Sequence, residues 1–403
     1  MKVMKSLKLK DDLYWVGVID KDLKVFDIIM ETKYGTTYNA FVLKGSEKTA
    51  LFETAKVGFK DEFFERLADV VDIKKIDYLV VDHTEPDHSG SIERLLMINP
   101  DIVIVGTVAA ITFLKKIVNH EFKHLIVKDK DTISLGNKTL EFMPLPNLHW
   151  PDSMFTYVKE DGLLFTCDVF GAHYSDPVLL KSKVDNDKAY QESVKYYFDH
   201  IMKPFSNPFM ANALTRIADL KIEMICTGHG PIIDEKIDEA IAYYQQWIKV
   251  PLKGSNKLVV IPYVSAYGYT KELALQIEKA LIDDSGIDVE LYDMVYARKD
   301  EVLDRMFLAD GIIFGSPTIV AEALKPIWDL TTSISSVNYK DKLMAAFGSY
   351  GWSGEAVINL TERLRQLKAE VMDGYRVRFK PNAEELKGAY DFGSKFALRL
   401  KER

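Results

Sequence analysis

Four side chains that can bind a metal ion lie directly after an apolar run. The run 76–81 predicts a buried strand. The donors that follow it are His83, Glu85, Asp87 and His88. Pro86 disfavours a helical conformation for the residue before it and has no backbone donor, so we expect a loop to follow the strand. A helix should then begin at Ser89 and Gly90 and run through 92–96.

Three more donors lie where other predicted strands begin or end. They are His149, Asp168 and His229. Any one of these histidines is more often a hydrogen-bonded structural residue than a ligand, but seven donors at strand ends are hard to explain in that way. A tetrahedral zinc site needs only four ligands, so seven nitrogen and oxygen donors indicate two metal ions that each keep an open position.

A hydroxyl-rich turn in the second half of the chain has the composition of a phosphate site. It connects a predicted strand, 257–264, to a predicted helix, 270–282, and free N–H groups at a helix N-terminus bind phosphate. The turn lacks the lysine of a nucleoside-triphosphate loop and the G-x-G-x-x-G of a dinucleotide site, so the phosphate of FMN fits best. The alternative is an ordinary helix cap. The turn consists of Ser265, Ala266, Tyr267, Gly268, Tyr269 and Thr270.

Two further loops favour the flavin over the helix cap. Each follows a predicted strand, and in a doubly wound sheet both would lie beside the turn, where ligands bind. Their small residues let the backbone approach a ring, and an aromatic side chain can stack on it. The residues concerned are Ser316, Pro317, Thr318, Ser349, Tyr350, Gly351, Trp352, Ser353 and Gly354.

The elements that must position these residues fall into two domains. Residues 1–250 predict short antiparallel strands (13–19, 25–28, 38–42 and 49–52), followed by mixed strands and helices, which two mixed sheets faced by helices would accommodate. A polar segment with Pro and Gly, 251–256, is the expected linker. Residues 251–403 alternate helices with five apolar strands, which predicts a doubly wound parallel sheet. The strands are expected at 257–264, 287–292, 311–314, 343–347 and 371–377.

Composition excludes several classes of protein. The net charge of −8 and the lack of a long basic run argue against nucleic acid or an anionic membrane as a partner. Two cysteines without a C-x-x-C, Cys167 and Cys226, exclude a disulfide framework and a cysteine-ligated iron site within this chain, and both are expected to be small buried residues. No signal peptide or membrane span is evident, so we expect a soluble cytoplasmic protein.

The motifs resemble those of flavodiiron proteins over essentially the whole chain. The specific features are H-x-E-x-D-H from His83 to His88, then His149, Asp168 and His229 at the family's spacing, together with the flavodoxin-like loops. The resemblance implies an α/β protein in which a metallo-β-lactamase-like αββα sandwich precedes a flavodoxin-like doubly wound parallel sheet.

The resemblance also implies which residue holds which metal. One iron would be held by His83, Glu85 and His149, the other by Asp87, His88 and His229, with Asp168 as the bridge. Related zinc hydrolases have histidine where Glu85 stands, and a carboxylate there favours iron that cycles between Fe2+ and Fe3+ over redox-inert zinc.

The implied activity is reduction of O2 to water or of NO to N2O, with FMN and two iron ions as cofactors. Electrons would come from rubredoxin or a similar carrier, and a head-to-tail homodimer, alone or paired into a tetramer, would bring one subunit's FMN to the other's irons. Two alternatives stay open: a dinuclear zinc hydrolase fused to a flavodoxin-like module, and a flavin electron carrier whose metal domain is only structural.

Each of four residues near the expected ligands has two possible roles. Asp82 and Asp152 would orient histidine rings or, as we expect, act as ordinary loop caps. His173 and Tyr174 would line the metal pocket or lie in a surface loop.

Overall fold

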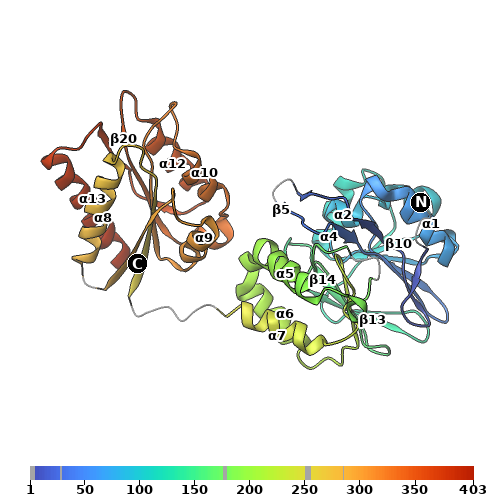
Figure 1. Cartoon of the computed structure of the whole chain (residues 1–403). Coiled ribbons are helices and arrows are strands. Elements are labelled where there is room, and N and C mark those ends of the chain that lie inside the picture. Colours follow the sequence, from blue (N-terminus) through green and yellow to red (C-terminus); the bar gives the residue numbers. More distant parts are fainter. Residues whose placement is uncertain (1–4, 28–29, 176–178, 250–255, 285) are drawn as a thin grey trace. The chain divides into compact units, whose positions relative to one another are not determined.

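The computed structural model describes residues 5–27, 30–175, 179–249, 256–284 and 286–403. The chain divides into two compact units, Met1–Lys249 and Val250–Arg403 (Figure 1). The expected linker 251–256 lies outside the described residues except for Asn256. Among the helices in the described parts of the chain, none is both long and apolar enough to cross a membrane.

The first unit contains two mixed sheets, as predicted. The larger has the order β1 (Leu7–Lys8), β2 (Leu13–Trp15), β7 (Phe41–Lys44), β8 (Thr49–Phe52), β9 (Tyr78–Val80), β10 (Val103–Gly106), β11 (His124–Ile126). The smaller has the order β12 (Thr132–Ser134), β13 (Thr139–Pro144), β14 (Met154–Val158), β15 (Leu163–Cys167), β16 (Met224–Thr227). Two short pairs accompany them: β3 (Val18–Asp20) with β6 (Thr36–Tyr38), and β4 (Val25–Phe26) with β5 (Met30–Glu31).

Three apolar layers build this unit into an αββα sandwich. One layer fills the space between the two sheets, where the rings of Phe52 and Phe165 stack with centroids 3.7 Å apart. A second lies under α1 (Lys60–Val70), α3 (Ile92–Ile98) and α4 (Val108–Ile117) on the outer face of the larger sheet. The third lies under α5 (Asp187–Tyr197), α6 (Ala211–Ile217) and α7 (Ile237–Trp247) on the smaller sheet.

Three sequence predictions for this unit were wrong. The strand expected over 38–42 is the end of β6 and the start of β7, which belong to different sheets. The single strand expected over 13–19 is two strands, because Gly17 passes so close to the backbone of residues 38–40 that a Cβ would lie 2.3 Å from the carbonyl oxygen of Tyr38. The loop expected after the ligand strand is instead a short helix, α2 (Pro86–Ser89). Glu85 is extended, as a residue before proline should be, but Pro86 occupies the first helical position, where its missing N–H costs nothing.

The second unit is a doubly wound sheet in which every strand pair is parallel. Its order is β18 (Ile287–Asp293), β17 (Lys257–Tyr263), β19 (Gly311–Gly315), β20 (Leu343–Tyr350), and β21 (Glu370–Val371) and β22 (Tyr375–Arg378) both pair with β20. The strand expected over 371–377 is therefore split in two. Helices α8 (Tyr269–Ile282) and α13 (Ala383–Lys401) cover one face (Figure 1). The other face is covered by α9 (Lys299–Leu308), α10 (Lys325–Thr332) and α12 (Glu355–Gln366).

Candidate metal centre and flavin site

The seven expected ligands come from the ends of strands in both sheets of the first unit. His83 to His88 follow β9 of the larger sheet. Asp168 and His229 follow β15 and β16 of the smaller sheet, and His149 lies between β13 and β14. Six of the seven side chains are buried, and His149 keeps 17% of its side chain exposed. Residues far apart in the chain therefore meet between two sheets.

The first cluster consists of His83, Glu85, His149 and one oxygen of Asp168. Glu85 Oε2 lies 3.2 Å from His83 Nε2 and 3.1 Å from His149 Nε2. Asp168 Oδ2 lies 3.5 Å from His83 Nε2 and 3.2 Å from His149 Nε2. Two donors that each lie about 2.1 Å from one ion in tetrahedral geometry are about 3.4 Å apart, so this spacing fits a metal site.

The second cluster consists of Asp87, His88, His229 and the other oxygen of Asp168. Asp168 Oδ1 lies 3.1 Å from His88 Nε2 and 3.3 Å from His229 Nε2. Asp87 Oδ2 lies 3.2 Å from His229 Nε2, and both Asp87 oxygens are buried without a hydrogen-bond donor in the described parts of the chain. The two oxygens of Asp168 thus face different clusters, as a bridging carboxylate must.

The three expected flavin loops lie together at the carboxyl ends of β17, β19 and β20. The hydroxyls of Thr270 and Ser349 are 2.9 Å apart, and Thr318 N–H donates to Ser349 O at 2.9 Å. Thr318 Oγ1 also accepts from the N–H of Ala356, at 3.2 Å. The loops are therefore held to one another and form one site.

The turn before α8 has room for a phosphate. Gly268 has a φ of +88°, no side chain caps the helix from this position, and a Cβ there would meet nothing within 4 Å. Ser265 Oγ reaches the first helical turn, where it accepts from Lys271 N–H at 3.3 Å. Tyr267 and Trp352 flank the site with more than four-fifths of their surface exposed, which leaves both aromatic faces available for a ring.

Comparison with known proteins agrees with this geometry. The family described as "ODP family beta lactamase" matches residues 36–230, and the flavodoxin family matches residues 261–393. The flavo-diiron protein FprA2 of Clostridium acetobutylicum is 39% identical over 404 residues, covering 98% of this chain and 100% of that protein. The chain belongs to the flavodiiron protein family.

Solved structures show the same two-domain fold as this flavodiiron protein. The flavodiiron protein from Giardia intestinalis has a TM-score of 0.68 and 29% identity, covering 100% of this chain and 98% of that one. Rubredoxin oxygen:oxidoreductase from Desulfovibrio gigas has a TM-score of 0.69 and 26% identity, covering 99% of both chains. The predicted αββα sandwich followed by a flavodoxin-like sheet is thereby confirmed.

Asp152 is a partner of a ligand histidine, and our expectation that it is a loop cap was wrong. Its Oδ2 accepts from His83 Nδ1 at 3.1 Å and from the N–H and hydroxyl of Thr84 at 2.7 and 2.8 Å. This fixes the His83 ring with Nε2 toward the first cluster. Asp82 instead accepts from Thr156 Oγ1 at 2.7 Å, and among the described residues no histidine ring donates to its carboxylate.

Replacing Asp152 with alanine should weaken metal binding by about 10- to 100-fold, because the His83 ring loses the partner that orients it. We expect Asp152→Asn to weaken it less, since the amide oxygen can still accept from Nδ1. Competition with a chelator during iron or zinc binding measures both affinities. Equal affinity of the alanine variant and the unaltered protein would show that Asp152 does not orient His83.

A buried asparagine that sequence reasoning missed holds the His229 loop. Asn39 Nδ2 donates to Thr227 O and Gly230 O, both at 2.9 Å, and Asn39 Oδ1 accepts from Trp15 Nε1 at 2.9 Å. The His229 ring is fixed by its Nδ1, which lies 2.7 Å from Thr37 O. Sequence alone gives no signal for Asn39, because its partners in the His229 loop lie 188 and 191 residues away.

Strong electrostatic coupling joins the ligands in the metal-free site. Burial opposes protonation of the histidines, yet the nearby carboxylates of Asp168 and of Glu85 or Asp87 raise the pKa of His149 to about 9 and that of His229 to about 10. Burial likewise opposes ionisation of Asp168, yet His88, His149 and His229 hold its pKa well below the usual value. Without metal, the site therefore stores protons on its histidines at neutral pH.

Metal binding at neutral pH should release protons, because a histidine must be neutral to bind a metal. The pKa values of His149 and His229 are raised, so their protons are present below about pH 9 and oppose binding more strongly as the pH falls. We expect affinity for Zn2+ to rise about tenfold per pH unit per proton released between pH 6 and 8. Calorimetry in buffers of different ionisation enthalpy counts the protons, and a pH-independent affinity would contradict this assignment.

Two residues near the ligands, His173 and Tyr174, are both buried, so neither lies in a surface loop. The His173 ring lies 5.3 Å from that of His229 and 4.9 Å from that of Tyr197. Tyr174 packs against Tyr34 instead. The pKa of His173 lies well below its usual value, mainly because the ring is buried and secondly because His229 carries charge nearby. The ring is therefore neutral.

Cys167 is the one sulfur beside the clusters among the described residues. Its Sγ lies 4.0 Å from Asp168 Oδ1, and Cys167, His88 and Asp168 together could hold an ion. Burial raises the pKa of the thiol well above its usual value, so it stays protonated. This agrees with the prediction of a small buried residue.

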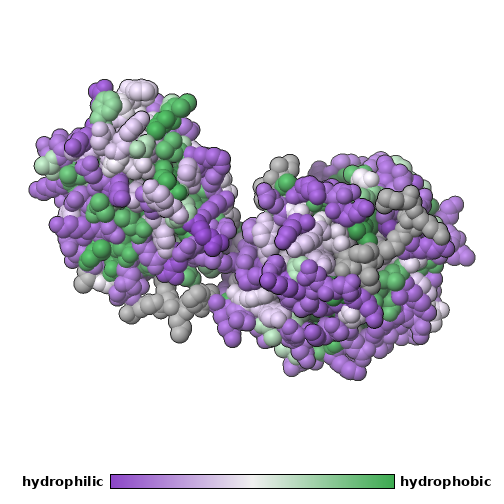
Figure 2. Space-filling view, viewed as in Figure 1, coloured by the Kyte–Doolittle hydropathy of each residue, from purple (hydrophilic) through white to green (hydrophobic). Residues whose placement is uncertain are grey.

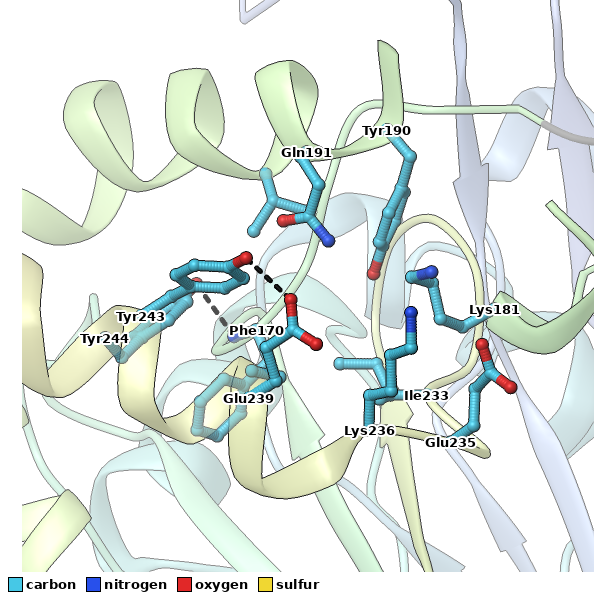
Figure 3. Close-up of a pocket in the computed structure, with 12 residues that line it drawn as sticks. Phe170, Lys181, Tyr190, Gln191, Ile233, Glu235, Lys236, Glu239, Tyr243 and Tyr244 are labelled. Atoms are coloured by element: carbon cyan, nitrogen blue, oxygen red, sulfur yellow. Dashed lines mark hydrogen bonds between the residues drawn. The ribbon is translucent and has the colours of Figure 1, made fainter. Parts of the chain in front are cut away.

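A separate small pocket lies between α5 and α7 (Figure 3). Tyr190, Lys181 and Lys236 point into it, and Tyr243 Oη donates to Glu239. Tyr244 Oη accepts from Phe170 N–H at 3.0 Å, which fixes the backbone two residues after Asp168. None of the expected ligands lines this pocket. Its wall is linked to the metal centre indirectly, because the Tyr244 hydroxyl holds the loop that follows Asp168.

Proposed function

We propose that this flavodiiron protein reduces O2 to water, NO to N2O, or both, at a non-haem diiron site, with electrons passed through FMN from an external carrier such as rubredoxin. The observation that carries the proposal is the pair of clusters that share Asp168. Two adjacent ions with a common carboxylate can act together on one small molecule.

We assign the ligands as the family resemblance implies. His83, Glu85 and His149 hold one iron, and Asp87, His88 and His229 hold the other, with Asp168 shared. Support for iron comes from Glu85, whose Oε2 contacts two histidines of its cluster and adds a hard oxygen donor. A dinuclear zinc hydrolase fused to a flavodoxin-like module is the alternative, and it leaves the acidic first cluster unexplained.

We assign the three loops of the second unit to FMN. The turn from Ser265 to Thr270 would hold the phosphate, and the loops 316–318 and 349–354 would contact the ring. The open space at Gly268 and the exposed faces of Tyr267 and Trp352 support this assignment.

The names of relatives support the choice of substrates. The nitric oxide reductase of Moorella thermoacetica is 35% identical to this chain, covering 97% of this chain and 98% of that protein. The similar structure from Desulfovibrio gigas is named for oxygen and rubredoxin. Both gases are small and apolar, so the preference between them depends on the pocket beyond the ligands.

Bound iron would supply two electrons and the place where the gas is reduced, and bound FMN would supply two more. The chain itself keeps the ligands in position and limits the access of water. Glu85 and Asp168 carry the negative charge that offsets the ions, and Asp152 and the Thr37 carbonyl hold the rings of His83 and His229. Burial of six of the seven expected ligands limits the access of bulk water to the clusters.

Exposed apolar residues at the carboxyl edge of the second unit support a head-to-tail dimer. Six residues that follow β17, β18, β19, β20 and β22 are each more than half exposed: Tyr267, Val295, Tyr296, Val320, Trp352 and Phe379. Figure 2 shows hydrophobic residues at the surface of this unit among hydrophilic ones. Apolar surface around a cofactor edge indicates a partner. We propose the metal-bearing unit of a second copy, with sedimentation as the test.

Stopped-flow reoxidation tests the function. The fully reduced protein is mixed with O2 or NO, and both the flavin and the iron absorbance are followed. We expect rapid reoxidation by at least one gas, and only the slower direct reaction of the reduced flavin with O2 in a zinc-loaded control. Purified protein with stoichiometric zinc, negligible iron and hydrolytic activity would support the alternative.

A further inference from the structure

His173 has one nitrogen bonded and one nitrogen free. Its side chain is buried, and Nδ1 lies 3.0 Å from Thr36 Oγ1. Nε2 has no hydrogen-bond partner within the described ranges, although it is shielded from solvent. Phe26 covers the ring at 4.4 Å, and Tyr197 meets it edge-on at 4.9 Å. A buried polar atom without a partner is costly, so such an atom beside a ligand site points to a bound molecule.

The His173 ring lies beside the second cluster. It is 5.3 Å from the ring of His229 and 4.9 Å from that of Tyr197, which itself lies 5.9 Å from His229. A molecule held at the second cluster would therefore lie near this ring.

The hydrogen bonds of Thr36 determine which nitrogen of His173 carries the proton. His229 Nδ1 lies 2.7 Å from the Thr37 carbonyl, which can only accept, so this nitrogen is protonated and cannot accept from Thr36. The Thr36 hydroxyl therefore has two acceptors, Thr37 O at 3.3 Å and His173 Nδ1 at 3.0 Å. The shorter contact favours donation to Nδ1, and in a neutral ring this places the remaining proton on Nε2.

We propose that His173 is a further substrate-contacting residue, whose Nε2–H donates a hydrogen bond to the small molecule held at the two clusters, with Thr36 fixing the tautomer. This inference rests on the proposed diiron site. The donor would stabilise an oxygen or nitrogen atom that gains negative charge during reduction, because such an atom becomes a stronger acceptor.

Azide binding to the oxidised, iron-loaded protein tests the proposal, since azide can accept hydrogen bonds but cannot donate them. We expect His173→Leu to weaken azide binding about tenfold, the value of one hydrogen bond to a charged group. His173→Gln should bind azide nearly as well as the unaltered protein, because its amide N–H can replace Nε2–H. Thr36→Val should weaken binding about threefold, and Thr36→Ser should not.

Iron analysis of each variant separates this proposal from the proposed function. An unaltered protein without two irons per chain would refute the diiron site itself. With iron retained, equal azide affinity of His173→Leu and the unaltered protein would overturn the donor role. Equally weakened azide binding in His173→Leu and His173→Gln would also overturn it, because the loss would then come from altered packing and not from a lost hydrogen bond. If the His173 variants do not fold, unchanged azide affinity in Thr36→Val overturns the proposal.

Discussion

Asp168→Ala should give a protein that purifies without iron at either position. The two carboxylate oxygens face different clusters, at 3.1 Å from His88 and 3.2 Å from His149, so one substitution removes a donor from each site. It also removes the main partner of three histidines, which would then repel one another. Loss of a residue that only orients a ligand already costs 10- to 100-fold in affinity, so we expect a loss above about 100-fold at both positions.

Iron per chain and the rate of reoxidation by O2 and NO measure this effect. His149→Ala is the informative comparison, because His149 touches only the first cluster and its loss should leave the second iron bound. Asp219→Ala, at an exposed aspartate, controls for the change of charge and should keep both irons. An Asp168→Ala protein that retains iron would mean that Asp168 is not a shared ligand.

Gly268→Glu should give a protein without flavin. The new carboxylate would project from the turn into the open space assigned to the phosphate, and juxtaposed like charges cost several kcal/mol. FMN affinity should therefore fall by about 100-fold or more. Absorbance of the purified protein and titration of the flavin-free protein with FMN give the result.

Gly286→Glu is a matched control within the same unit. Gly286 also has a φ of +88°, and a Cβ there would also meet nothing within 4 Å, but it precedes β18 at the opposite edge of the sheet. Both variants pay the same backbone cost of about 1–2 kcal/mol for a non-glycine residue at positive φ. Flavin loss in Gly268→Glu alone locates the phosphate, whereas full retention there would exclude the turn as its site.

Sequence reasoning performed best where the apolar pattern was long and regular. The first three strands of the second unit were predicted to within one residue, because a buried parallel strand is an unbroken apolar run, whereas β20 is three residues longer than predicted and the last strand is split. The first unit was harder, since several of its strands have two or three residues and Gly17 interrupts one of them. Pro86 has two effects: it disfavours a helical conformation for Glu85, and it is itself favoured at the first position of a helix. The expected loop reflects only the first effect.

The clustering of the candidate ligands could be expected, because seven histidines and carboxylates follow or precede strands, where reactive side chains are usually displayed. The residues that support them could not be. Asp152 is 69 positions from His83, and Asn39 is 191 from Gly230, so their roles depend on tertiary contacts that no local pattern encodes. The contact of Tyr197 with His173 was likewise not predicted, because a tyrosine in a helical pattern indicates only a core residue.

Each metal cluster takes donors from both sheets of the first unit. His83 to His88 extend from the larger sheet, and Asp168 and His229 extend from the smaller one. An ion bound there is a cross-link across the sandwich, and it stabilises only the folded form. Heat-induced unfolding of the first unit should thus occur at lower temperature after chelation, while the second unit, which holds no part of either cluster, melts as before.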